Sequence, residues 1–137
     1  MNRLLKSIRG LFFFGTALLL SSCVGGVSEQ LRLSETEIYF GAEGGTATVT
    51  SNIKCTLDNI KDNQGSVYTW EYNIMPSGRH RKTEWLEANG LTATDNDFHS
   101  ITVSVSPSTE QREWTVRALA GDSGSREFKV YQNAGGH

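Results

Sequence analysis

The sequence predicts an all-β protein, a single sandwich of about seven short antiparallel strands. From residue 31 onward, apolar and polar residues alternate with a period of two, which is typical of strands that bury one face. Gly, Asn, Asp and Pro clusters interrupt the alternation at short intervals and predict turns. No window has apolar residues at helical spacing, so no helix is expected after the N-terminal leader.

The strands follow from the alternating runs, taken in order. They are predicted at residues 31–33, 37–40, 46–51, 67–75, 98–106, 112–119 and 126–132. Residues 58–65 are rich in Asp and Asn and are predicted to form a turn or loop. Residues 77–97 show no sustained pattern and are expected to be irregular.

The strand at 67–75 is the most aromatic, and it places Tyr68, Trp70, Tyr72 and Ile74 on one face. Exposed flat rings could stack on sugars, but the positions between them are polar, as expected for an outward face. The favoured interpretation is therefore that the aromatic face lies in the core, where each ring buries a large area.

The irregular segment is the expected place for a binding surface, because loops on rigid sandwiches often carry function. The candidate ligand-binding residues are Trp70, Tyr72, Arg79, Arg81 and Trp85. For both Trp85 and Trp114, a buried position that fills the core (a core plug) is favoured over ligand contact. The basic run at residues 79–82 is expected to be a solvated loop.

The N-terminus has the organisation of a signal peptide. Arg3, Lys6 and Arg9 precede an apolar run at residues 11–20, which is shorter than the about 20 residues that a membrane helix needs. The run ends in Leu20-Ser21-Ser22-Cys23, which resembles the lipobox of bacterial lipoproteins. This resemblance implies that residues 1–22 are removed and that the Cys23 thiol carries a diacylglycerol. Residues 23–30 would then form a flexible tether. An uncleaved membrane helix is the alternative.

The mature chain would have 115 residues, enough for one domain with a core of its own. It contains ten Lys and Arg residues and fifteen Asp and Glu residues, so its net charge is −5. This balance argues against a nucleic-acid partner, which needs a concentrated basic face. With Cys23 committed to lipid, Cys55 has no disulfide partner and is expected to be a small buried hydrophobe.

No set of catalytic residues is apparent. Gly121-Asp122-Ser123-Gly124 matches the nucleophile motif of chymotrypsin-like proteases, but these residues lie between two strands, where they suit a hairpin turn. The Asp and Asn residues at 58–63 and 95–97 lack calcium-loop spacing, and His80 and His99 have no neighbouring ligands in the sequence. The expectation is a non-enzyme with no metal and no cofactor other than the lipid on Cys23.

Residues 31–52 contain the order Leu-x-Leu-Ser, Ile-x-Phe, then Gly-Gly-Thr-x-Thr-Val-Thr-Ser-Asn. With Trp85-Leu86 and the closing Phe-x-Val-Tyr-Gln at 128–132, this resembles a BACON-type domain over residues 31–134, with 135–137 as a tail. The resemblance implies an Ig-like sandwich of the kind found in surface and periplasmic proteins of gut Bacteroidetes, often beside glycan-processing enzymes. The chain departs from the pattern in having Lys54-Cys55-Thr56 where such domains usually place a tryptophan, and in a longer stretch at 58–75.

The resulting expectation is a lipid-anchored, non-catalytic envelope module that binds glycan or mucin, or acts as a spacer associated with polysaccharide utilisation. The alternative is a structural or assembly subunit that engages neighbouring envelope proteins through an edge strand. Position 24 is Val rather than the Asp associated with inner-membrane retention, which favours an outer-membrane lipoprotein, facing either the periplasm or the exterior.

Overall fold

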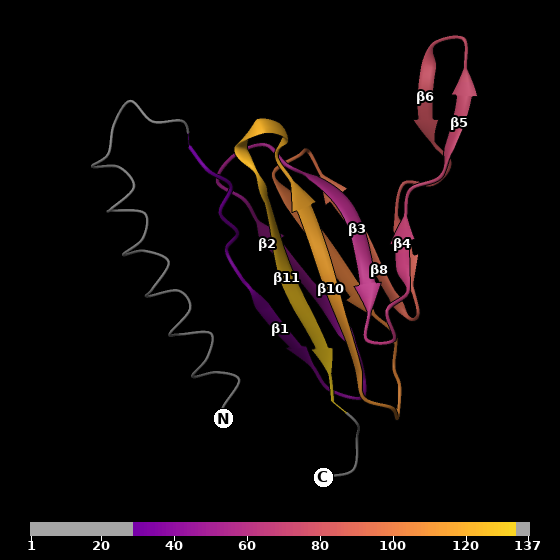
Figure 1. The fold of residues 1–137 in the computed structure, drawn as a ribbon. Helices are drawn as coiled ribbons and strands as arrows, with labels where there is room; N and C mark the ends of the chain where they lie inside the picture. The colour runs from indigo at the N-terminus through magenta and orange to yellow at the C-terminus, as the bar shows by residue number, and fades with distance from the viewer. Residues whose placement is uncertain (1–28, 134–137) are drawn as a thin grey trace.

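The computed structural model describes residues 29–133, and in them the chain forms the predicted all-β sandwich (Figure 1). The predicted signal peptide, Cys23, residues 24–28 of the predicted tether and the C-terminal tail lie outside the described residues. No helix within the described part of the chain is long and apolar enough to cross a membrane. The helical structure described is a single 3-10 turn, η1 (Gly121–Ser123).

The first sheet has five strands in the order β1-β11-β10-β3-β4. Their bounds are β1 Glu37–Phe40, β11 Ser125–Gln132, β10 Arg112–Leu119, β3 Thr56–Asp62 and β4 Val67–Thr69. All neighbours are antiparallel except β1 and β11, which pair in parallel. The sequence predicted only antiparallel strands. The next strand in the chain, β2, belongs to the other sheet. The partner of β1 in its own sheet is β11, at the far end of the chain.

The second sheet has four antiparallel strands in the order β2-β9-β8-β7. Their bounds are β2 Gly45–Thr50, β9 Ser100–Val105, β8 Leu91–Asn96 and β7 Leu86–Ala88. A third, two-stranded element, β5 (Tyr72–Met75) with β6 (Gly78–Arg81), pairs with neither sheet and projects from one end of the sandwich (Figure 1).

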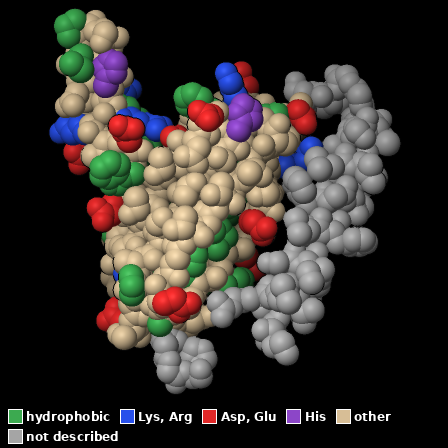
Figure 2. All heavy atoms as spheres, turned by 180° about the vertical axis from the view of Figure 1, so that it is seen from behind, with side chains coloured by type: hydrophobic (Ala, Val, Ile, Leu, Met, Phe, Trp, Pro, Cys, Tyr) green, Lys and Arg blue, Asp and Glu red, His purple; other side chains and the backbone are tan. Residues whose placement is uncertain are grey.

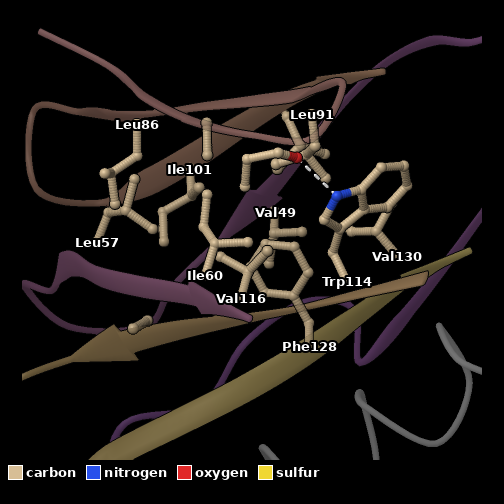
Figure 3. Packing of buried hydrophobic residues seen from close by; sticks show 14 of the residues in the cluster. Val49, Leu57, Ile60, Leu86, Leu91, Ile101, Trp114, Val116, Phe128 and Val130 are labelled. Atoms are coloured by element: carbon tan, nitrogen blue, oxygen red, sulfur yellow. Dashed lines mark hydrogen bonds between the residues drawn. The ribbon is translucent and has the colours of Figure 1, made fainter. Parts of the chain in front are cut away.

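The core lies between the two sheets and is filled by alternate residues of the strands. Figure 3 shows side chains from both layers meeting there, with Phe128 and Trp114 the largest. The Trp114 indole crosses from β10 and donates from Nε1 to the carbonyl oxygen of Ala88 on β7, at 2.7 Å. Trp114 is therefore a core plug, as predicted. Cys55 is also buried, which confirms its predicted hydrophobic role.

The prediction of a turn at residues 58–65 was wrong, because most of this segment belongs to β3. Opposite Arg117 and Ala118 of β10, the pairing skips Asp58, which makes a β-bulge. The bulge lets both Leu57 and Ile60 face the core although they are three residues apart. It therefore breaks the period of two on which the sequence prediction depended, and the turn is confined to the residues after Asp62.

The predicted strand at 67–75 is two strands, β4 and β5, separated at Trp70 and Glu71. The segment 77–97 is mostly ordered in β6, β7 and β8 rather than irregular, so the basic run does not form a loop. At residues 31–33 there is no full strand; Leu33 forms one bridge with Ser51. The Gly121-Asp122-Ser123-Gly124 motif does form the turn between β10 and β11, as predicted.

Candidate functional site

The candidate site is the β5–β6 hairpin with the segment that follows it to Trp85. A two-residue loop, Pro76-Ser77, joins the strands, and Tyr72 pairs with Arg81 at the base. All four residues of β5 are exposed. Figure 2, from the opposite side to Figure 1, shows the hairpin standing clear of the rest, with Lys and Arg side chains gathered near its base.

Four of the five predicted site residues converge on this hairpin as two cation–π pairs. The guanidinium of Arg79 lies over the Tyr72 ring, 4.0 Å from its centroid, and that of Arg81 lies over the Trp70 ring at 3.7 Å. Such contacts stabilise by about 0.5–1 kcal/mol when exposed and more when desolvated. They also cover one face of each ring, so that face is closed to a stacked sugar.

The hairpin is attached to the sandwich through Trp70 and Arg81. Trp70 Nε1 donates to the carbonyl oxygen of Leu57 at 2.8 Å. Arg81 Nη1 donates to Asp95 Oδ1 at 3.1 Å, and Asp95 Oδ2 accepts the Leu57 backbone N–H at 3.1 Å. Because the Asp95 side chain is only 10% exposed, this ion pair is screened less than a surface pair. These contacts hold the base of the hairpin against β3 and β8.

The predicted aromatic face is divided by this geometry. Tyr68 and Trp70 are partly buried and pack against the core, as the favoured interpretation expected. Tyr72, at 37% exposed, and Ile74, at 78%, lie beyond the break in the strand and face solvent. Trp85 is 48% exposed in the segment between β6 and β7, so the prediction of a core plug was wrong for this residue. Its own carbonyl accepts a hydrogen bond from the Thr83 hydroxyl at 2.7 Å.

Sequence reasoning missed the apolar tip of the hairpin. Ile74 was assigned to the inner face, and Met75, which is 51% exposed, was not considered. A partial signal was present, because Pro76, Ser77 and Gly78 are turn-forming residues, and the structure uses Pro76-Ser77 as a two-residue loop directly before Gly78, whose φ is 122°. That spacing is typical of a tight hairpin, and a detached hairpin exposes both faces of its strands.

At the β3–β4 turn, which leads toward the hairpin, the carboxylate of Asp62 is used structurally. Desolvation alone would raise the pKa of Asp62, but hydrogen bonds from the Ser66 and Gln64 amides and the Tyr68 hydroxyl outweigh it and lower this pKa. The same contact with Asp62, followed by desolvation, raises the pKa of Tyr68. Asp62 and Asp95 are thus both engaged in hydrogen bonds. Within residues 29–133 no group of three or more His, Cys, Asp or Glu is placed to hold a metal ion.

A second surface is the outer face of the four-stranded sheet, which Figure 2 shows as a broad area nearly free of charged and apolar side chains. It is covered by hydroxyl groups, some of which pair across strands, as Thr48 with Thr102 and Thr46 with Ser104, each at 3.0 Å. β2 forms one edge of this sheet, carries no charged residue, and at six residues is longer than the other edge strands, β1, β4 and β7.

Comparison with known proteins adds little to this geometry. No family model matches the chain, and no curated protein matches it. Among solved structures it is similar to a Bacteroides ovatus GH5 xyloglucanase in complex with an XXXG heptasaccharide, at 12% identity and a TM-score of 0.44. The similarity covers 77% of this chain and 19% of that one, so this chain spans about a fifth of the length of the enzyme.

Proposed function

We propose that the protein is a lipid-anchored, non-catalytic module of the cell envelope, held at the outer membrane through Cys23, with its ligand site at the base of the β5–β6 hairpin. The observation that carries the ligand site is the convergence of Trp70, Tyr72, Arg79 and Arg81 on an element outside both sheets. Residues on an element that belongs to neither sheet are less constrained by packing than strand residues of the sandwich, and binding groups often lie on such elements. The anchor is supported by the lipobox-like sequence before Cys23.

The ligand class that we propose first is a glycan. Tyr72 and Trp85 carry partly exposed rings, and Arg79 supplies donors beside one of them. Trp70 is better suited to holding the hairpin in place than to stacking on a sugar. Its indole N–H donates to the Leu57 carbonyl oxygen, and Arg81 covers one face of its ring. We therefore assign sugar contact to Tyr72 and Trp85, with Trp70 and Arg81 holding the base in place.

The second candidate is assembly with a neighbouring envelope protein through β2. An uncharged edge strand of six residues presents unpaired backbone groups that can add a strand from a partner. Within residues 29–133 only its end is covered, where the Ser34 N–H donates to the Thr50 carbonyl oxygen at 2.8 Å.

The anchor is tested by replacing Cys23 with serine in the full chain. Wild-type protein is expected in the membrane fraction and soluble only in detergent, whereas Cys23→Ser protein is expected in the soluble fraction. Fractionation with mass measurement of the wild-type N-terminus checks both points. A Cys23→Ser variant that stays fully membrane-bound would instead indicate an uncleaved helix.

The ligand is tested by glycan-array and mucin binding, followed by Trp85→Ala and Tyr72→Ala. Loss of a single stacking contact is expected to weaken binding about tenfold, since 1.4 kcal/mol corresponds to that factor. Val67→Ala is the matched control, because Val67 is also exposed but lies away from the hairpin. Absence of glycan binding, together with a co-purifying envelope protein that Thr48→Lys on β2 releases, would favour the assembly function.

A further inference from the structure

Exposed apolar side chains gather at one end of the molecule. Seven large apolar residues in the described range are exposed: Val67, Tyr72, Ile74, Met75, Trp85, Phe98 and Leu119. Tyr72, Ile74 and Met75 belong to the hairpin. Phe98 and Leu119 lie at the end of the sandwich from which the hairpin projects.

Three contacts identify this end. Leu119 pairs with Thr56 at the start of β3, the Phe98 carbonyl accepts the Cys55 N–H at 2.7 Å, and the Trp70 indole bonds Leu57. Trp85 lies on the segment that leads back from the hairpin to β7. Val67 is the exception, because it pairs with Lys61 near the opposite end of β3.

The described chain begins at the same end. The Leu31 N–H donates to the Ser123 carbonyl in η1 at 3.3 Å, and the Asn52 amide donates to the Gln30 carbonyl at 2.9 Å. Figure 1 shows the start of the coloured, described chain and the β5–β6 hairpin both at this end of the sandwich. Cys23 precedes Glu29 by six residues, which reach at most about 20 Å when extended. A lipid on Cys23 would therefore keep this end of the domain close to the membrane.

The charge of the hairpin differs from that of the rest of the molecule. Residues 72–82 carry Arg79, Arg81 and Lys82 and no carboxylate, whereas the remainder of the mature chain has seven Lys and Arg against fifteen Asp and Glu. Arg81 is paired with Asp95, and Lys82 with Glu71 at 3.5 Å. Arg79 has no carboxylate within ion-pair distance in the described residues and lies opposite Ile74. It is therefore available to a phosphate.

The length of the hairpin fits the thickness of the headgroup layer of a bilayer. Four residues of strand extend about 13 Å, and each headgroup layer of a bilayer is about 7 Å thick. With Ile74 and Met75 at the boundary of the acyl chains, Arg79 would lie among the phosphates and the end of the sandwich just outside them. The apolar tip is far smaller than the roughly 800 Å² that each partner buries in a stable protein complex. Contact with lipid requires no such complementary surface.

We propose that the β5–β6 hairpin is a membrane-docking element, whose tip enters the anionic phospholipid leaflet beside the anchor and orients the domain. This proposal rests on the proposed anchoring at Cys23 and adds a second point of contact to it. Apolar burial of the tip and the attraction of Arg79 to anionic lipid act together.

The test uses the full-length lipidated protein in vesicles of phosphatidylethanolamine with phosphatidylglycerol. An environment-sensitive fluorophore is attached at Ile74→Cys, where the native side chain is 78% exposed, or, as the control, at Val67→Cys, where the native side chain is 52% exposed and lies toward the opposite end of the sandwich. Cys55 is buried and does not compete for the label. The label at position 74 is expected to shift to the blue and to be quenched by a bilayer-embedded quencher, and the label at 67 is not.

Arg79→Glu is expected to reduce the shift, as is replacement of the lipid by phosphatidylcholine alone. An unshifted label at position 74 on vesicle-bound protein would overturn the docking proposal while leaving the anchor intact. A shift that appears in native outer membranes but never in pure lipid would also overturn it, because the partner would then be a protein.

If the mature protein carries no lipid, the anchoring proposal fails separately, and docking is measured by adding the full chain to preformed vesicles. Binding that Ile74→Asp abolishes and Val67→Asp preserves would support docking. Absence of any binding would overturn it.

Discussion

Trp114→Ala is expected to lower the free energy of unfolding by about 3–5 kcal/mol, the range for removal of a large aromatic side chain from a core. The residue is 1% exposed and belongs to the largest side chains between the sheets. Its loss leaves a cavity and also removes the donor to the Ala88 carbonyl, which is one of the links between β10 and β7. Urea denaturation followed by circular dichroism measures the change, since fluorescence would lose one of its own probes.

Trp114→Phe separates the two contributions. It keeps much of the apolar volume but cannot donate to Ala88, so a smaller loss of about 1–3 kcal/mol is expected from the lost buried hydrogen bond and the unfilled volume. If Trp114→Ala cost less than Trp114→Phe, the apolar volume of the indole, which Figure 3 shows among the buried side chains, would contribute nothing to the stability of the fold.

Gln132→Leu is expected to destabilise the fold by about 2–4 kcal/mol, because it removes several buried hydrogen bonds that contribute about 0.5–1.5 kcal/mol each, and more where the partner is charged, as Arg112 is. Gln132 is 1% exposed at the end of β11. Its Oε1 accepts from Arg112 Nη2 at 2.8 Å, and its Nε2 donates to the carbonyls of Gly41 and Ser106 at 3.1 and 3.0 Å. One side chain thus joins segments that flank both sheets.

The matched control is Glu127→Leu on the same strand. Glu127 is exposed, so its replacement should change the free energy of unfolding by no more than about 0.5 kcal/mol. Equal effects of the two substitutions in thermal or urea unfolding would show that the Gln132 hydrogen bonds contribute nothing beyond the hydrophobicity of the new residue.

The candidate site was predictable in its composition and not in its arrangement. Trp70, Tyr72, Arg79 and Arg81 could be chosen from the sequence, because the first two belong to the aromatic stripe and the other two to the segment expected to carry a binding surface. Their pairing could not, because it depends on which residues of β5 and β6 lie opposite each other. The exposure of Ile74 and Met75 could not be predicted either, because it follows from the separation of β5 and β6 from both larger sheets.

The sequence by itself determined the all-β class and most of the core. Ile101, Val103 and Val105 of β9, and Trp114, Val116 and Ala118 of β10, alternate strictly and are all buried. This succeeds because side chains on a strand point to opposite faces in turn, so burial of one face appears directly in the local pattern.

Only the tertiary structure decided the bulge at Asp58, the parallel pairing of β1 with β11, and the detachment of the β5–β6 hairpin from both sheets. The bulge and the parallel pairing depend on partners far along the chain, and the detachment depends on β5 pairing with neither larger sheet. The local pattern records that one face of a strand is buried, but the strands that bury it are selected by packing and backbone hydrogen bonding over the whole domain.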